Sequence, residues 1–136
     1  MENATSGASA ARSTQITIVN GTKYELEYLG SELQHGVWNG GPVETVNPHT
    51  VRVVAQNDSD GLMTGAQGWL AYKVVDFKHV SDQRITLFWD NPFKGDNSYS
   101  CNNDTASDLR LYLNYCRCGK GDNAEISFIL CEAADY

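Results

Sequence analysis

The chain has 136 residues, 41% of them hydrophobic and 20% charged, which is the composition of a globular domain rather than of a disordered segment. Its length fits one domain, and its apolar runs are far shorter than the roughly 20 residues of a membrane-spanning helix. Ten Lys and Arg against 17 Asp and Glu give a net charge of −7, which argues against nucleic acid as a partner and against electrostatic attraction to an anionic lipid surface. A zwitterionic lipid headgroup, a sugar or another protein remains compatible with this charge.

The N-terminal segment, residues 1–14, is small and polar and predicts a flexible arm. It lacks the apolar stretch of a signal peptide, so we expect a chain that is cytoplasmic or released by a non-classical route. Residues 15–136 are expected to form one folded domain.

Alternating, β-branched segments separated by turn residues follow the arm. The dipeptide Asn20-Gly21 after the first segment is a hairpin signal. Short strands at a spacing of roughly 8–15 residues predict an all-β, single-domain antiparallel β-sandwich. The expected strands cover residues 15–19, 24–29, 43–46, 50–55, 68–75, 84–89, 109–115 and 124–130.

Residue types that carry catalysis or bind metals form no recognisable motif in the sequence. The three histidines lie in different segments without ligand spacing and are interpreted as solvated loop residues. The four cysteines lack the C-x₂-C pairs of a zinc site, and the sequence does not choose between disulfides and free thiols. We therefore expect a non-enzymatic protein without cofactor or metal. The three histidines are His35, His49 and His79, and the four cysteines are Cys101, Cys116, Cys118 and Cys131.

Two segments combine turn residues with aromatic side chains. Residues 61–72 contain three glycines that lead into an aromatic strand, which predicts a tight, exposed turn where the backbone approaches something closely. Residues 88–99 place aromatic residues on both sides of a loop that contains Pro92 and charges of both signs. Trp and Tyr suit a membrane interface or a saccharide face because an apolar ring carries a polar tip. Trp89 fits a core position equally well, whereas Phe93 lies in the loop and has less reason to be buried.

These two segments resemble stretches of the aegerolysins. Residues 64–68 with Tyr72 resemble the aegerolysin sequence S-G-T-E-G with a tyrosine after it, and residues 89–97 resemble W-D-C-P-W-x-S-x-x-N. Residues 64–72 are also similar to the T-G-A-x-G-x-L-A-Y sequence of the actinoporins. Both families are β-sandwiches that bind sphingolipid headgroups.

The resemblance implies a lipid-binding toxin of the aegerolysin-like cytolysin type that acts at target membranes on a zwitterionic sphingolipid headgroup. Because residues 1–14 have almost no apolar face, we expect pore formation and hemolysis to need a larger partner protein. A carbohydrate-binding, lectin-like sandwich and a structural protein without ligand stay open as alternatives. The expected contact residues are aromatic, with a neighbouring proline and one acid and one base for the two headgroup charges: Trp38, Trp69, Trp89, Asp90, Pro92, Phe93, Lys94 and Tyr99.

Overall fold

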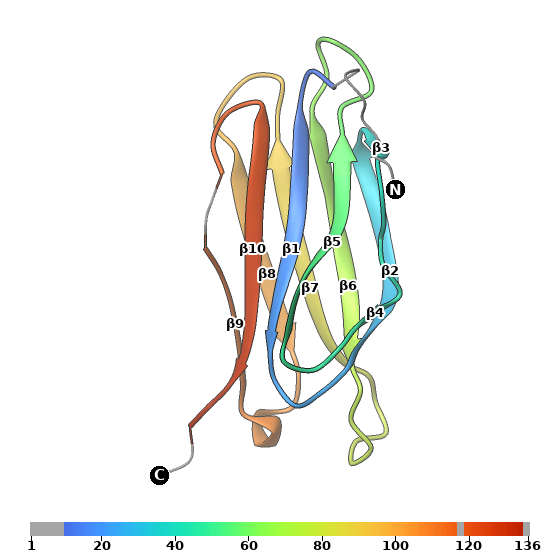
Figure 1. The fold of residues 1–136 in the computed structure, drawn as a ribbon, viewed down its shortest axis with the longest axis vertical. Coiled ribbons are helices and arrows are strands. Elements are labelled where there is room, and N and C mark those ends of the chain that lie inside the picture. The colour runs from blue at the N-terminus through green and yellow to red at the C-terminus, as the bar shows by residue number, and fades with distance from the viewer. Residues whose placement is uncertain (1–9, 117–118, 135–136) are drawn as a thin grey trace.

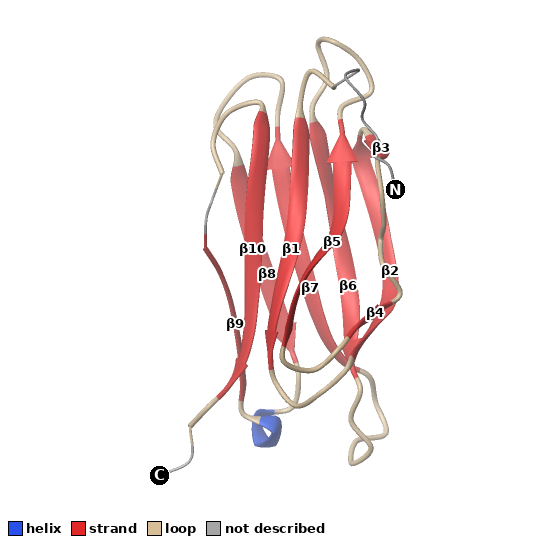
Figure 2. Cartoon of the chain, viewed as in Figure 1, coloured by secondary structure: helices blue, strands red, loops and turns tan. Residues whose placement is uncertain are grey.

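The computed structural model describes residues 10–116 and 119–134, which form two sheets packed face to face (Figures 1 and 2). The strands of the first sheet are β1 (Ser13–Gly21), β3 (Val37–Trp38), β5 (Thr50–Asp58), β9 (Leu111–Cys116) and β10 (Asn123–Glu132). Those of the second sheet are β2 (Leu26–His35), β4 (Thr45–Val46), β6 (Ala66–Val74), β7 (Gln83–Asn91) and β8 (Ser98–Asp104). The strand orders are β3-β5-β1-β10-β9 and β4-β2-β6-β7-β8, and a short 3₁₀ helix, η1 (Ser107–Leu109), follows β8.

The predicted single-domain β-sandwich is confirmed. Neighbouring strands of the described residues pair in antiparallel fashion, apart from β1 and β10, which run parallel with Ser13 opposite Asn123. In β1 every second side chain is buried, because its alternating sequence places Ile16 and Ile18 on one face of the sheet.

The boundary of the predicted arm is wrong by two residues. Strand β1 begins at Ser13, whose N–H donates to the carbonyl of Asp122 at 2.8 Å. Thr14 is fully buried, because the alternation of the strand continues past Gln15 toward the N-terminus. Residues 1–9 of the arm lie outside the described residues.

The hairpin predicted at Asn20-Gly21 is also wrong, because β1 and β2 lie in different sheets. The Asn20 side chain is buried and its Nδ2 donates to the carbonyls of Tyr24 at 2.8 Å and Asn47 at 3.1 Å. Its Oδ1 accepts from the N–H of Thr22 at 3.1 Å. The asparagine therefore ties together the connection that crosses between the sheets.

Strand β8 is absent from the sequence-based assignment. Its sequence is mostly polar, and most of its side chains are exposed. It nevertheless pairs with β7 at the edge of the second sheet, with Tyr99 opposite Trp89. An edge strand with one solvated face needs few apolar residues, so its sequence carries a weak signal.

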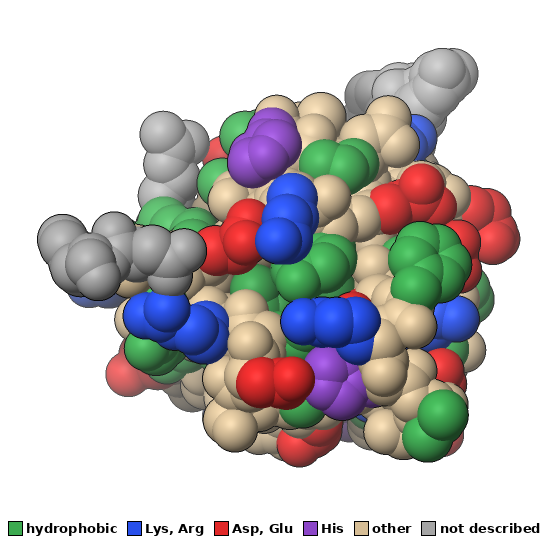
Figure 3. Space-filling view, turned by 90° about the horizontal axis from the view of Figure 1, so that it is seen from below, with side chains coloured by type: hydrophobic (Ala, Val, Ile, Leu, Met, Phe, Trp, Pro, Cys, Tyr) green, Lys and Arg blue, Asp and Glu red, His purple; other side chains and the backbone are tan. Residues whose placement is uncertain are grey.

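The loops gather at two opposite ends of the sandwich (Figure 1). We call the end formed by residues 59–65, 92–97 and 119–122 the upper end, and the end formed by residues 22–25, 75–82 and 105–110 the lower end. Figure 3 views the molecule from the lower end. Among the described residues, the structure contains no helix that is long and apolar enough to cross a membrane.

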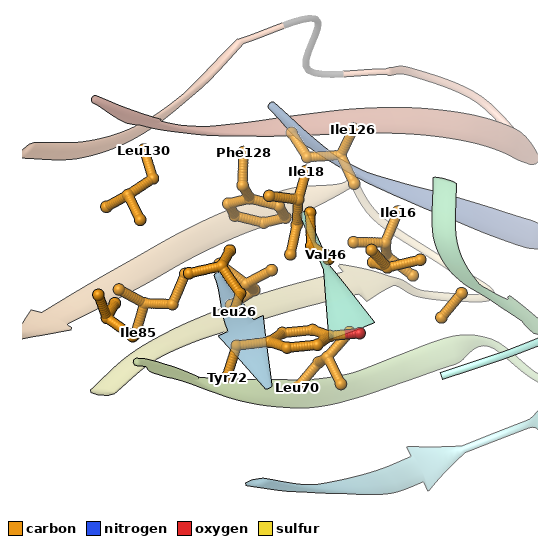
Figure 4. Packing of buried hydrophobic residues seen from close by; sticks show 14 of the residues in the cluster. Ile16, Ile18, Leu26, Val46, Leu70, Tyr72, Ile85, Ile126, Phe128 and Leu130 are labelled. Atoms are coloured by element: carbon orange, nitrogen blue, oxygen red, sulfur yellow. The ribbon is translucent and has the colours of Figure 1, made fainter. Parts of the chain in front are cut away.

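The interior is filled by side chains from both sheets. Figure 4 shows the rings of Tyr72 from β6 and Phe128 from β10 in the same interior, with aliphatic side chains between them. The Tyr72 hydroxyl donates to the carbonyl of Val43 at 2.7 Å, and burial raises the pKa of Tyr72. The tyrosine of the aegerolysin-like motif is therefore a core residue whose polar tip is satisfied.

Among the described residues, Cys101, Cys116 and Cys131 are free thiols. Burial raises the pKa of the Cys101 thiol, which faces the carbonyl of Leu113. Cys118 lies outside the described residues.

Candidate functional site

Two loops meet at the upper end because a glycine lets their backbones touch. Residues 59–65 connect β5 to β6, and residues 92–97 connect β7 to β8. A Cβ atom on Gly65 would lie 2.7 Å from the carbonyl oxygen of Asn91 and 3.0 Å from the Cα of Pro92. The close approach expected of this glycine segment is thus made to the neighbouring loop of the same chain.

Trp89 lies in the core beneath these loops. Its side chain is 2% exposed, and its Nε1 donates to Oδ1 of Asn57 at 2.9 Å. A Cβ atom on Gly68 would lie 3.0 Å from Cζ2 of Trp89, so this motif glycine makes room for the indole ring. The prediction that Trp89 contacts the ligand directly is therefore wrong. The alternation along β7 turns Trp89 inward, so it supports the site from the core.

Two further predicted aromatic residues also face inward. The rings of Trp38 and Trp89 have centroids 6.0 Å apart, and Trp38 packs against the core while remaining partly exposed. The Tyr99 hydroxyl donates to the carbonyl of Gly119 at 2.8 Å, which ties β8 to the loop before β10. These three aromatic side chains belong to the core or pack against it beneath the upper end.

Arg12 connects the segments of the upper end. Its guanidinium donates to the carbonyls of Leu62 at 3.1 Å and Thr64 at 3.3 Å, and lies 4.6 Å from the centroid of the Phe93 ring. Its Nε lies 3.7 Å from a carboxylate oxygen of Asp122, and the side chain is 11% exposed. One partly buried cation thus joins the loops before β6, β8 and β10.

Phe93 lines two hollows of the upper end. A cavity of about 460 Å³ lies between residues 92–97 and 119–122, and a second of about 330 Å³ lies toward β2 and β6. Apolar walls and charges of both signs meet around the first cavity. Its lining is Asn91, Pro92, Phe93, Gly95, Asp96, Asn97, Lys120, Gly121 and Asp122, and that of the second is His35, Met63, Thr64, Gly65, Gln67, Asp90, Pro92 and Phe93.

Exposed apolar side chains surround these hollows. Leu62 is 83% exposed, Met63 is 72% exposed and Phe93 is 36% exposed. Lys94 is exposed on the same loop as Phe93 but lines neither cavity. Lys120, which the sequence analysis did not single out, is the lysine of the larger cavity.

A different surface carries Trp69, on the outer face of the second sheet. Trp69 lies opposite Phe88 on the neighbouring strand, and both rings are partly exposed. A hollow of about 430 Å³ beside Phe88 is lined also by Gln34, Asp90 and Ser100. Asp90 therefore lies between this outer face and the smaller cavity of the upper end.

The family model of the aegerolysins matches residues 11–107 of the chain. The chain belongs to the aegerolysin family. Its fold is similar to that of the lipid-binding protein Nakanori, with a TM-score of 0.73 and 12% identity over 89% of this chain and 71% of that one. It is also similar to IP-1A from Alcaligenes faecalis, with a TM-score of 0.66 and 14% identity over 93% of this chain and 94% of that one. No curated protein sequence matches the chain significantly.

In this aegerolysin the predicted site residues fall into four places. Pro92, Phe93 and Lys94 lie on the upper loop, Trp69 on the outer sheet face, and Asp90 between them. Sequence reasoning missed Arg12 and Lys120. Arg12 was assigned to the arm, although the alternation that begins at Ser13 is a signal that could have placed it beside the first strand. In the fourth place, Trp89 lies in the core, and the partly buried Trp38 and Tyr99 pack against it.

Proposed function

We propose that this aegerolysin is a non-enzymatic protein that binds the zwitterionic headgroup of a membrane sphingolipid at its upper end. The observation that carries the proposal is the cavity beside Phe93, where an aromatic wall meets Lys120 and the carboxylates of Asp96 and Asp122. A phosphocholine-type headgroup carries one cation and one anion, so it needs an apolar or acidic partner and a basic partner in one small space. A volume of about 460 Å³ falls in the range of small-ligand pockets, about 300–1,000 Å³.

The chemistry assigns a role to each wall of this cavity. The quaternary ammonium group lies against Phe93 and near Asp96, since cations are attracted to aromatic faces and to carboxylates. The phosphate lies toward the Lys120 ammonium group. Leu62 and Met63, which project from the adjacent loop, enter the interfacial region of the bilayer, where each buried apolar side chain contributes about 1.5–3 kcal/mol when fully removed from water.

The description of Nakanori as a lipid-binding protein supports this proposal. The upper end offers three exposed apolar side chains, Leu62, Met63 and Phe93, which suit shallow anchoring at the interface. We therefore propose that cytolytic activity, with pore formation and hemolysis, requires a larger pore-forming partner protein. Vesicle leakage should accordingly need that partner, whereas vesicle binding should not.

Vesicle sedimentation at low and high salt tests the headgroup assignment. With a net charge of −7, the protein should bind sphingomyelin vesicles almost equally well at both salt concentrations, because there is little long-range attraction to screen. Binding to purely anionic vesicles should be weak. Stronger binding to anionic lipid that disappears at high salt would contradict the proposal.

The outer face of the second sheet supports carbohydrate binding as a second candidate function. Trp69 and Phe88 form an aromatic platform there, and Gln34, Asp90 and Ser100 supply amide, carboxylate and hydroxyl groups beside it. Sugars are commonly held by such stacking and hydrogen bonding. Competition with free sugars separates the two candidates: sugars should leave vesicle binding unchanged if the upper end recognises lipid, and should inhibit binding if this face recognises a glycan.

A further inference from the structure

The lower end carries a second pair of apolar side chains in water. Phe77 is 95% exposed and Val80 is 107% exposed, and both belong to the loop of residues 75–82 between β6 and β7. Seen from below, hydrophobic side chains project between basic and acidic ones (Figure 3). Large apolar side chains that touch so little of their own protein are candidates for contact with another surface.

A network of carboxylates and one histidine holds this loop in shape. The Asp76 carboxylate accepts the backbone N–H groups of Lys78 at 3.3 Å and His79 at 3.1 Å, which closes a tight turn around Phe77. The His79 ring bonds to the same carboxylate through Nδ1, and to Asp108 of η1 at 3.0 Å through Nε2. The interpretation of His79 as a solvated loop histidine is therefore wrong, because carboxylates from two segments engage both ring nitrogens.

Two lysines accompany the apolar residues. Lys78 lies on the same loop and Lys23 lies in the loop between β1 and β2; both line a groove of about 620 Å³ with Tyr24, Pro48 and Phe77. Lysines beside apolar side chains can reach the phosphate level of a bilayer while the apolar groups enter below it. The acidic groups nearest this groove are Glu25 and Asp76, and Asp76 is engaged by His79.

The upper and lower ends cannot meet the same flat bilayer. Strands such as β1 and β7 run from end to end, and nine residues at about 3.3 Å each span about 30 Å. The loop between β5 and β6 lies at one end of this length, and the loop between β6 and β7 lies at the other (Figure 1). The first loop carries the exposed Leu62 and Met63, and the second carries the exposed Phe77 and Val80. A protein bound through its upper end therefore presents the loop of residues 75–82 away from that membrane.

We propose that the lower end is a second bilayer contact, so that one molecule tethers two membranes. This inference rests on the proposed function of the upper end. A bilayer suits the lower end because two exposed apolar side chains can enter the membrane interface while the adjacent lysines reach the phosphate level, and neither contact needs a shaped partner surface.

Clustering of sphingomyelin vesicles, measured by light scattering, tests the proposal. Sedimentation of the same samples measures how much protein binds the vesicles. The lower-end variant is Phe77→Ser with Val80→Ser, the upper-end variant is Leu62→Ser with Met63→Ser, and Val53→Ser on a sheet face is the matched control. The wild type and the control should cluster vesicles when protein is scarce. Each end variant should still bind vesicles through its other end, but more weakly than the wild type. Because the tether needs one apolar end for each membrane, each end variant should lose at least about ninety per cent of the clustering.

Each other outcome has a definite meaning. A lower-end variant that clusters vesicles like the wild type overturns the tether, and so does a wild type that binds vesicles without clustering them; both leave the proposed function intact. An upper-end variant with wild-type binding overturns the proposed function instead. If the upper-end variant binds no vesicles and the free wild type has the mass of a dimer, the lower end contacts a second copy and the bilayer assignment is wrong.

Discussion

Arg12 lies over the ring of Phe93, with its guanidinium carbon 4.6 Å from the ring centroid. The same guanidinium donates to two carbonyls of the neighbouring loop. Arg12, the residue just before the first strand, therefore holds the aromatic ring that lines both cavities of the upper end. Phe93 is 36% exposed, so one part of the ring supports the loop and another faces solvent.

Arg12→Ala should lower the free energy of unfolding by about 1–3 kcal/mol, because it removes a partly desolvated cation–π contact and charged hydrogen bonds. Urea denaturation measures this change. Lys94→Ala on the adjacent loop is the control, and its effect should stay within about 0.5 kcal/mol because the side chain is exposed. Equal midpoints for the two variants would show that Arg12 does not hold the loops together.

Gly68→Ala should destabilise the protein by about 1–3 kcal/mol, because the new methyl group would lie 2.6 Å from the carbonyl oxygen of Glu32 and 3.0 Å from the Trp89 ring. Gly30→Ala is the control, since the nearest atom to its Cβ is Cη2 of Trp69 at 3.9 Å. Thermal melting should separate the two variants clearly. A Gly68→Ala protein as stable as Gly30→Ala would contradict the packing role of the motif glycine.

Trp89→Phe should cost about 1–3 kcal/mol of stability, because Oδ1 of the buried Asn57 loses its indole donor. Trp89→Ala should cost about 3–5 kcal/mol through the cavity that it leaves. Vesicle binding per folded molecule should be unchanged for Trp89→Phe. A stable Trp89→Phe protein with impaired binding would return Trp89 to the contact surface.

The His79 bridge should make stability depend on pH. The hydrogen bond that the His79 ring donates to the Asp76 carboxylate raises the pKa of His79. The bridge therefore stabilises the fold fully below the ordinary histidine pKa of about 6.5, and this stabilisation is lost as pH rises through the raised value. Burial alone would raise the pKa of Asp76, but the hydrogen bonds that its carboxylate accepts from His79 and from the backbone lower it. The stability that the Asp76 carboxylate contributes is therefore lost only as pH falls through that lowered value. The stability difference between wild type and His79→Gln should therefore shrink from about pH 5 to about pH 9. A difference independent of pH would exclude a charged bridge.

Strong local patterns made much of the fold predictable. The alternation in residues 68–75 and 84–89 placed β6 and β7 in the sandwich, and the glycine segment marked the close approach at Gly65 and Gly68. The polar edge strand β8 was missed because one solvated face leaves little periodicity in hydrophobicity. Asn20-Gly21 was misassigned because the local turn preference lost to hydrogen bonds that the buried Asn20 side chain makes with the nearby Tyr24 and the distant Asn47.

The candidate site was predictable only where one loop supplies it. Pro92 and Phe93 stand out in the sequence, because aromatic residues flank a proline in a charged loop. Arg12 and Lys120 join the same place from segments about a hundred residues apart, and such an encounter depends on the parallel pairing of β1 with β10. Trp89 illustrates the opposite error, since side-chain type alone does not reveal which face of a strand is buried.

Binding of the Leu62→Ser, Met63→Ser double variant to sphingomyelin vesicles tests the central claim most directly, with a melting curve recorded for the same sample. Both side chains are largely exposed, so the variant should melt like the wild type and like Val53→Ser. Its affinity for the vesicles should fall by about tenfold or more, because two apolar groups no longer leave water at the membrane interface. A variant that melts normally and binds sphingomyelin vesicles as tightly as the wild type would contradict the assignment of the upper end as the lipid-binding surface.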